Sequence, residues 1–155
     1  MELNIYTDGA CSQGAATTNQ EGGWGMYVVE GDVRLYGAAK STTNNIMEMT
    51  AFLRALNYAT NYPANIINIY SDSAYILNCF KQKWYVNWEK NGWRNAKKQP
   101  VKNQVLWELI LKIKRELEAK GKVLNFIKVK AHSTDKYNNI ADALAVKGRE
   151  EAKDL

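Results

Sequence analysis

The succession of strand-like and helix-like runs most strongly restricts the fold of this chain. Strand patterns, rich in β-branched and aromatic residues, cover residues 2–8, 24–29, 33–39, 66–71 and 123–130. Helical patterns cover residues 42 to about 61, 72–80, 104–119 and 138–150. The predicted order is therefore β-β-β-α-β-α-α-β-α. This order predicts an α/β fold with a five-stranded mixed sheet, an antiparallel meander followed by parallel strands, flanked by helices.

The length of 155 residues fits one domain, residues 1–155, which is large enough to bury a hydrophobic core. No apolar run approaches the roughly 18 residues of a membrane span, and the N-terminus lacks the features of a secretory signal. The two cysteines, Cys11 and Cys79, are too few for a disulfide framework, and with one histidine they are too few for a structural zinc site. We therefore expect a cytoplasmic protein without a membrane segment.

Positive charge is concentrated in one segment. The whole chain carries a net charge of +5. Residues 81–102 contain seven lysines and arginines but a single acid, Glu89, so this segment carries +6 and the rest of the chain −1. A basic segment on an otherwise nearly neutral protein is typical of a surface that binds a polyanion. The alternative is a solvated lysine-rich face that binds nothing.

The same segment is rich in tryptophan, because Trp84, Trp88 and Trp93 stand among the cations. Aromatic side chains stack on the bases and sugars of nucleic acids, so the combination favours nucleic acid as the polyanion. A second interpretation remains open. Trp84 and Trp88 are four residues apart and could form a buried pair on one face of a helix.

Four carboxylates are candidates for a metal site. Asp8 and Asp72 stand at the predicted ends of the first and fourth strands, where ligands of open α/β sheets bind. Glu48 and Asp142 lie on predicted helices that this topology could bring to the same edge. Clustered carboxylates repel one another unless they hold a cation, and an all-oxygen ligand set suits Mg²⁺ or Mn²⁺. Beside a basic, aromatic segment, such a cluster predicts phosphodiester chemistry by two metal ions.

Each carboxylate also has an ordinary structural interpretation. Asp8 could be a turn residue ahead of a glycine. Glu48 follows Asn45 by three residues and could complete a capping box. Asp72 could be the N-cap of the next helix, and Asp142 could face solvent near a helix N-terminus.

Five motifs, in the same order, resemble those of the type 1 ribonuclease H family, and the resemblance covers nearly the whole chain. They are YTDGAC, TTNNIMEM, YSDSAYI, the basic stretch WYVNWEKNGWRNAKKQPVKN, and VKAHSTDKYNNIADALA. The resemblance implies a ribonuclease H-like fold and an endonuclease that hydrolyses the RNA strand of RNA–DNA hybrids. It also implies products with 3′-hydroxyl and 5′-phosphate ends. The basic stretch, about residues 82–103, resembles the protruding handle of bacterial members.

The resemblance assigns Asp8, Glu48, Asp72 and Asp142 as catalytic metal ligands for two Mg²⁺ ions, with Mn²⁺ as a possible substitute. By this resemblance Asp8 bridges both metals, and Asp142 helps to hold the metal that activates water. Glu48 and Asp72 help to hold the metal beside the leaving oxygen. The single histidine, His132, corresponds to a flexible catalytic histidine of the family.

The resemblance also assigns contacts to the hybrid and implies a monomer. Thr43 and Asn103 match residues that grip a phosphate of the DNA strand, and Asn44 and Asn45 match residues that face the minor groove. An alternative role for these residues is helix capping. The handle residues expected to contact the DNA strand are Trp84, Trp88, Lys90, Trp93, Lys97 and Lys98.

Two other functions are compatible with the residues alone. One is a hybrid- or duplex-binding module that has lost catalysis, and the other is a nuclease or integrase of the same broad fold that acts on DNA. The sequence also departs from the family pattern. Ser41 stands where many relatives have an arginine, and the loop at residues 12–23 is longer than in many bacterial relatives.

Overall fold

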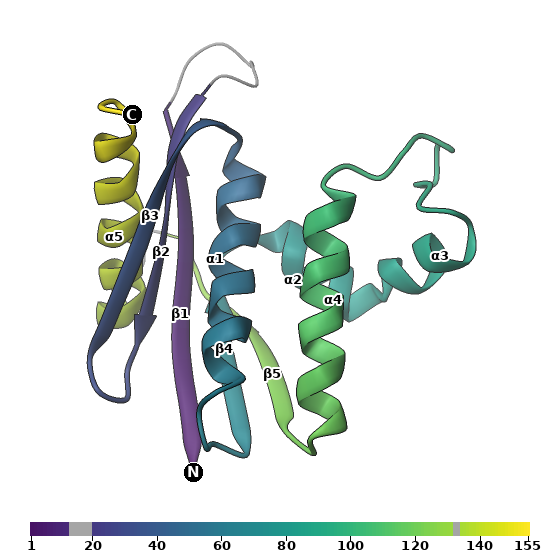
Figure 1. Cartoon of the computed structure of the whole chain (residues 1–155), viewed down its shortest axis with the longest axis horizontal. Helices are drawn as coiled ribbons and strands as arrows, with labels where there is room; N and C mark the ends of the chain where they lie inside the picture. The colour runs from purple at the N-terminus through teal and green to yellow at the C-terminus, as the bar shows by residue number, and fades with distance from the viewer. Residues whose placement is uncertain (13–19, 132–133) are drawn as a thin grey trace.

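A computed structural model describes residues 1–12, 20–131 and 134–155 of the chain, and these form a five-stranded sheet with helices on both faces (Figure 1). The strands are β1 (Glu2–Cys11), β2 (Gln20–Val28), β3 (Val33–Thr42), β4 (Ile66–Ser71) and β5 (Val123–Lys128). Their order in the sheet is β3-β2-β1-β4-β5. Strands β3, β2 and β1 pair antiparallel, whereas β1, β4 and β5 pair parallel. The predicted mixed sheet, a meander followed by parallel strands, is confirmed.

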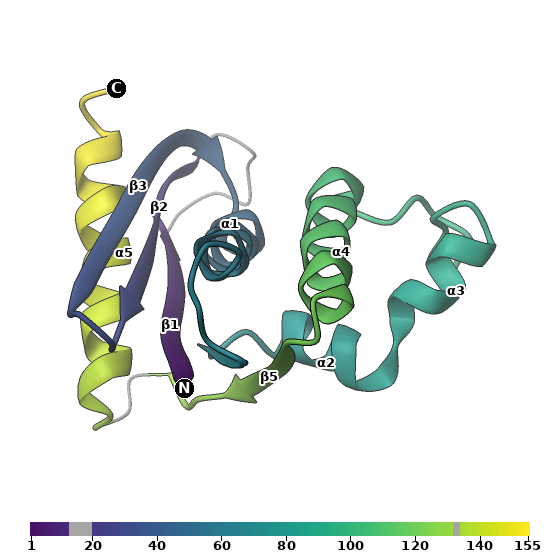
Figure 2. The same ribbon diagram turned by 60° about the horizontal axis from the view of Figure 1, so that its bottom comes forward.

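The helices are α1 (Asn44–Ala59), α2 (Ala74–Gln82), α3 (Trp84–Lys90), α4 (Gln104–Ala119) and α5 (Lys136–Ala152). Helix α5 covers one face of the sheet over β1 to β3, and α1 and α4 lie on the other side, with α3 protruding beyond α4 (Figures 1 and 2). None of the helices in the described ranges is long and apolar enough to cross a bilayer.

Helix α3 is the one element that the predicted order lacked. The chain turns sharply between α2 and α3 because Lys83 adopts a left-handed conformation with φ of 56°. Few residues other than glycine take this conformation, so the break is difficult to foresee from the sequence. The break redirects the chain away from the sheet and begins the protruding segment.

Two hydrophobic clusters lie on opposite faces of the sheet. The larger one fills the space between the sheet and helices α1 and α4, where Phe52, Ile69 and Trp107 are fully buried. The smaller one lies under α5 and is built around Tyr6, Tyr27 and Ala141. Helices α1 and α5 pack on opposite faces of the sheet. Side chains from both helices can therefore reach the carboxyl ends of the central strands.

The observed ends of a strand or helix match the predicted ends where they depend only on the local sequence pattern. Strand β4 and helix α4 have the predicted bounds, 66–71 and 104–119. Strand β1 instead continues to Cys11, because its residues from Asp8 onward pair with the glycine-rich start of β2. The prediction that Asp8 ends the first strand was therefore wrong, since Asp8 lies within β1 opposite Gly25.

Candidate metal centre and nucleic-acid groove

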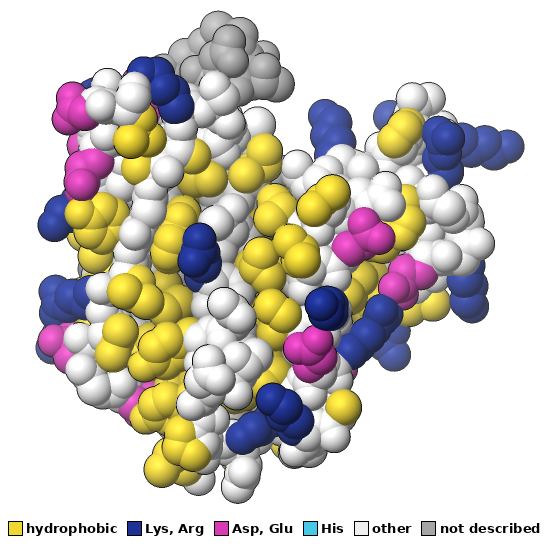
Figure 3. All heavy atoms as spheres, in the orientation of Figure 1, with side chains coloured by type: hydrophobic (Ala, Val, Ile, Leu, Met, Phe, Trp, Pro, Cys, Tyr) yellow, Lys and Arg dark blue, Asp and Glu magenta, His cyan; other side chains and the backbone are white. Residues whose placement is uncertain are grey.

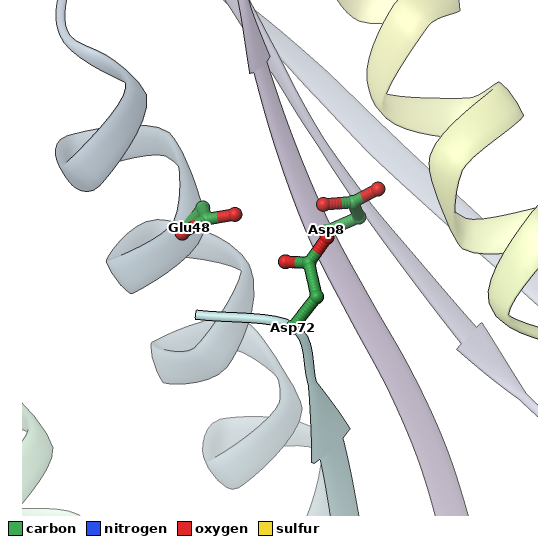
Figure 4. Close-up of side chains that lie close together, drawn as sticks. All are labelled: Asp8, Glu48 and Asp72. Carbon is green, nitrogen blue, oxygen red and sulfur yellow. The ribbon is translucent and has the colours of Figure 1, made fainter. Parts of the chain in front are cut away.

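Three of the predicted carboxylates meet at one edge of the sheet. Asp8, Glu48 and Asp72 each offer an oxygen atom, and these atoms all lie within 4.8 Å of one another. Figure 4 shows Glu48 reaching from α1 toward Asp8 on β1 and Asp72 just after β4. Asp8 and Glu48 are buried, with 6% and 9% of their surfaces exposed. Three residues that are far apart in the sequence are thus brought together by the parallel pairing of β1 with β4 and by the packing of α1.

Asp8 is held in place by its own strand. The backbone N–H of Gly9 donates a hydrogen bond of 2.8 Å to Oδ1 of Asp8. Gly9 itself is required for the close approach of α1, because a Cβ atom at this position would lie 2.5 Å from the backbone nitrogen of Glu48. The glycine next to the first aspartate therefore lets the helix that carries Glu48 pack directly on β1.

Glu48 does not cap a helix, and the capping-box interpretation was wrong. The N-cap of α1 is Thr43, whose hydroxyl accepts a hydrogen bond of 3.1 Å from the N–H of Ile46. Glu48 therefore lies in the second turn of α1, too far along the helix to reach back to the cap. Its side chain is directed to the carboxylate cluster instead.

Asp72 directly follows β4, as the sequence predicted, but it is not the N-cap of α2. That position belongs to Ser73, whose hydroxyl accepts a hydrogen bond of 3.2 Å from the N–H of Ile76. Because Ser73 satisfies the helix terminus, the carboxylate of Asp72 is left for the cluster.

Asp142 approaches the cluster from the opposite face of the sheet. It lies on α5, is half-buried, and acts on Asp8 both as a hydrogen-bonding partner and as a like charge. Gly25 permits this approach, since a Cβ atom there would lie 2.5 Å from the carbonyl oxygen of Ala141. The prediction that Asp142 gathers with the other acids agrees with this contact with Asp8, although it is outside the trio whose oxygens lie within 4.8 Å.

Burial and like charges raise the pKa of two of these groups. The pKa of Asp8 rises from 3.8 to about 8, chiefly through burial and then through the charge of Asp72 and the hydrogen bond with Asp142. The pKa of Glu48 rises from 4.5 to about 9, chiefly through burial and then through its hydrogen bond with Asp72. Without a cation, these carboxyl groups retain protons near neutral pH.

The donor set fits a hard divalent cation. It consists only of carboxylate oxygens, which Mg²⁺ and Mn²⁺ prefer to the nitrogen and sulfur donors of typical zinc sites. Helix α5 brings a fourth carboxylate, that of Asp142, to the same edge. A cation bound here would also favour the ionised forms of Asp8 and Glu48, which burial and like charges disfavour.

A groove of about 1150 Å³ lies between the start of α1 and the protruding segment. We call residues 82–103 the handle. The groove is lined by Asn45, Tyr75 and Trp84, and by the handle cations Lys90, Arg94 and Lys102. Figure 3 shows lysine and arginine side chains around the lobe that contains the handle. Concave shape, aromatic surface and positive charge together suit a nucleic-acid strand.

The three handle tryptophans differ in exposure. Trp88 is only 8% exposed and packs against Trp84, Trp93 and Trp107, with ring centroids 6.2, 5.9 and 5.8 Å away. Trp88 nevertheless lines the groove, so its contact with the substrate stays a prediction, to be made through the small exposed part of its ring. Trp84 and Trp93 are half-buried, and Trp84 also lines the groove.

The other predicted contacts fall in different places. Lys90 and Asn103 line the groove, whereas Lys97 and Lys98 are exposed outside its lining. Asn103 has the N-cap position of α4, at a left-handed φ of 63°, but its side chain makes no capping hydrogen bond. Its amide is therefore not occupied by the helix end.

At the start of α1, Thr43 caps the helix and Asn44 and Asn45 form its first turn. Asn44 is exposed, and Asn45 lines the groove. The capping interpretation is thus confirmed for Thr43 and wrong for the two asparagines. The prediction for His132 lies outside the described residues.

Several groove residues were not predicted individually. Arg94 and Lys102 were counted only in the total charge of the segment. Asn87, Asn91 and Asn95 also line the groove, and their regular four-residue spacing was a signal that the sequence offered.

Comparison with known proteins gives a consistent result. The family model described as RNase H matches residues 1–150. The chain is 45% identical over 146 residues to a Ribonuclease H of Moorella thermoacetica, covering 93% of this chain and 89% of that protein. It is 43% identical over 149 residues to a Ribonuclease H of Clostridium botulinum strain Hall, covering 95% of each.

Among solved structures, the chain resembles the crystal structure of LC9-RNase H1, a type 1 RNase H with the type 2 active-site motif. The TM-score is 0.79 at 21% identity, and the match covers 97% of this chain and 73% of the other. At this identity the likeness shows a shared fold.

Proposed function

This chain belongs to the ribonuclease H family and is a nuclease, and we propose that it hydrolyses the RNA strand of RNA–DNA hybrids by a mechanism that uses two divalent metal ions. The observation that carries this proposal is the carboxylate cluster of Asp8, Glu48 and Asp72 beside a basic groove. A carboxylate cluster alone would fit many metal enzymes, and a basic groove alone would fit many binding proteins. Their combination fits cleavage of a nucleic-acid backbone.

Asp8, Glu48, Asp72 and Asp142 are the proposed metal ligands, with Mg²⁺ as the proposed ion and Mn²⁺ as a substitute. Bound there, the ions would stabilise the attacking and leaving oxygens of an in-line displacement. A water molecule adds to phosphorus and the bond from phosphorus to the 3′ oxygen breaks, which leaves a 3′-hydroxyl and a 5′-phosphate. Of the four, we propose Asp8 as the residue shared by both ions.

The handle groove is the proposed site for the DNA strand. Lys90, Arg94 and Lys102 offer charges to its phosphates, and Trp84 and Trp88, which also line the groove, offer aromatic surface. Trp93, Lys97 and Lys98 remain proposed contacts at the outer part of the handle. Thr43 and Asn103 are proposed to grip one DNA phosphate.

Selection of RNA as the cleaved strand requires a contact with the ribose 2′-hydroxyl, the group that distinguishes RNA from DNA. Glu48 is well placed for this role because it lies on α1 and belongs to the carboxylate cluster itself. Asn44 and Asn45, one turn earlier on the same helix, are proposed to face the minor groove. His132 is proposed to assist proton transfer or product release. We further propose that the enzyme is a cytoplasmic monomer.

The test is incubation with a matched RNA–DNA hybrid, RNA duplex and DNA duplex, each with Mg²⁺ and with EDTA. We expect cleavage only of the hybrid, only in its RNA strand, and only with Mg²⁺. Hybrid binding without cleavage would instead indicate a binding module. Cleavage of DNA duplex in preference to the hybrid would indicate a DNA nuclease of the same fold.

A further inference from the structure

The single acid of the handle is committed to an ion pair with the body of the protein. Both terminal guanidinium nitrogens of Arg115 on α4 donate to the carboxylate of Glu89 on α3, with Nη2–Oε1 and Nη1–Oε2 distances of 2.7 and 2.8 Å. The hydrogen bond from Arg115 lowers the pKa of Glu89. Among the ion pairs of residues 1–12, 20–131 and 134–155, this one alone joins the handle to another element.

The rest of the handle is hydrogen-bonded to α3 and to itself. The N–H of Trp93 donates to the carbonyl oxygen of Trp88 at 2.7 Å, and the N–H of Val101 donates to that of Trp93 at 2.9 Å. Asn95 closes the tip by accepting from the N–H groups of Lys97 and Gln99, each at 3.0 Å. The direction of α3 therefore sets the position of the groove cations.

Helix α3 is poorly fixed by its own sequence. It has seven residues, and its N-cap, Lys83, makes no side-chain capping bond. Trp88 packs on Trp107 of α4, and Lys114 of α4 lies 5.8 Å from the ring centroid of Tyr85. Such apolar and cation–π contacts fix the direction of a helix less strictly than paired hydrogen bonds do. A bidentate arginine–carboxylate pair fixes orientation as well as distance. Glu89 lies at the far end of α3 from Lys83, where a small rotation of the helix produces the largest displacement.

We propose that the Glu89–Arg115 pair is a brace that holds the handle at the angle needed to bind the DNA strand of the hybrid. Glu89 and Arg115 are thus positioning residues for substrate binding. This inference rests on the proposed function, since it assigns the groove to the hybrid.

A simple electrostatic account predicts the opposite effect of losing Glu89. An acid among handle cations repels phosphate, so its neutralisation should tighten hybrid binding. The brace predicts weaker binding when the same charge is removed, because the handle cations then lose their alignment. The two accounts therefore predict opposite changes in the hybrid dissociation constant when Glu89 is neutralised.

The experiment compares hybrid dissociation constants in EDTA, and KM and kcat in Mg²⁺, for wild type, Glu89→Gln, Arg115→Gln, and the swap of Glu89→Arg with Arg115→Glu. Exposed ion pairs contribute up to about 1 kcal/mol, so we expect each single variant to bind about two- to fivefold more weakly. The weaker binding should raise KM and leave kcat nearly unchanged. The swap should recover most of the lost affinity.

Glu116→Gln is the matched control, because Glu116 is an exposed acid next to Arg115 that forms no ion pair with any residue in the described part of the chain. Thermal melting of each variant checks the fold. If Glu89→Gln binds as tightly as wild type or more tightly, or if the swap does not improve on the single variants, the brace is wrong. A wild-type protein that neither binds nor cleaves the hybrid would instead overturn the proposed function.

Discussion

The buried positions of the Asp8 and Glu48 carboxyl groups lower the stability of the metal-free protein. Both are buried beside further acids, and their pKa values are raised to about 8 and about 9. Burial and the neighbouring acids disfavour the ionised forms of both groups, and a bound cation favours them. Function and stability are therefore opposed at these residues when the metal is absent.

Asp8→Asn and Asp72→Asn should each reduce cleavage by more than about 10⁴-fold, because loss of a metal ligand removes several kcal/mol of transition-state stabilisation. Hybrid binding should survive, since the handle groove is untouched. Cleavage and hybrid binding are measured on the same preparations. Activity close to that of wild type in both variants would contradict the assignment of these ligands.

The stability of the metal-free protein should fall as pH rises. The pKa of Asp8 is raised from 3.8 to about 8 and that of Glu48 from 4.5 to about 9, so the fold favours their protonated forms. The stability that the two protonated groups contribute is complete below about pH 4. It is lost as pH rises through their folded-state pKa values. Chemical unfolding in EDTA between pH 5 and pH 9 measures the slope. Asp8→Asn should flatten it, and an equal slope in this variant would contradict the account.

His132→Ala should slow turnover by about 10² to 10⁴-fold if the histidine transfers a proton, without reaching the loss of Asp8→Asn. Single-turnover and steady-state rates separate its two proposed roles. A role in product release leaves the first turnover nearly normal, whereas proton transfer slows both rates. Thermal melting is the control, and unchanged rates would remove His132 from the proposal.

At the level of elements, the handle combines a small aromatic core with a charged surface. Trp88 is buried within it, and Lys90, Arg94 and Lys102 line the groove. The tryptophans thus serve first to build the handle, and the cations on its surface are the groups available to phosphates. Charge and packing make separable contributions to binding.

Lys90→Ala with Lys102→Ala should weaken hybrid binding and flatten its salt dependence, because each phosphate contact adds about 0.9 to the slope of log K against log salt on B-form DNA. Lys97→Ala with Lys98→Ala removes equal charge outside the groove and should flatten the slope less. Trp84→Ala should weaken binding with little change of slope. Titrations at several salt concentrations measure all three, and identical slopes for wild type and the Lys90/Lys102 variant would refute the groove assignment.

Across the whole molecule, the two faces of the sheet are packed unequally. Helix α1 buries large side chains, among them Met49, Phe52 and Leu56, whereas the buried side chains of α5 are small, apart from Asn138. Small side chains let α5 lie close to β2, but they remove less apolar area from water. The helix that carries Asp142 is therefore expected to be the less firmly held of the two.

Backbone amides of α5 should exchange hydrogen at lower protection than those of α1, because local opening costs less where less apolar area is buried. Mg²⁺ should raise the protection of α5 selectively, since Asp142 links this helix to the metal site. Native-state hydrogen exchange with Mg²⁺ and with EDTA measures both effects. Asp142→Asn is the control that should lose the metal effect, and equal protection of α1 and α5 would contradict the prediction.

Features that depend on local pattern could be predicted from the amino-acid sequence. The bounds of β4 and α4 follow from apolar periodicity, and the mixed sheet follows from the order of the elements. The motifs around the four acids and the charge of the handle were also visible without coordinates. Side-chain period and motif spacing are properties of neighbouring residues, so no long-range contact is needed to detect them.

The choice between alternative roles for a residue depended instead on long-range packing. Pairing with β2 placed Asp8 inside a strand, and Thr43 and Ser73 took the caps that Glu48 and Asp72 could have filled. Trp88 was buried because the left-handed turn at Lys83 and the side chain of Trp107 bring α3 against α4. These outcomes depend on contacts between residues far apart in the chain, whose free energies outweigh the small local preferences that a sequence pattern reports.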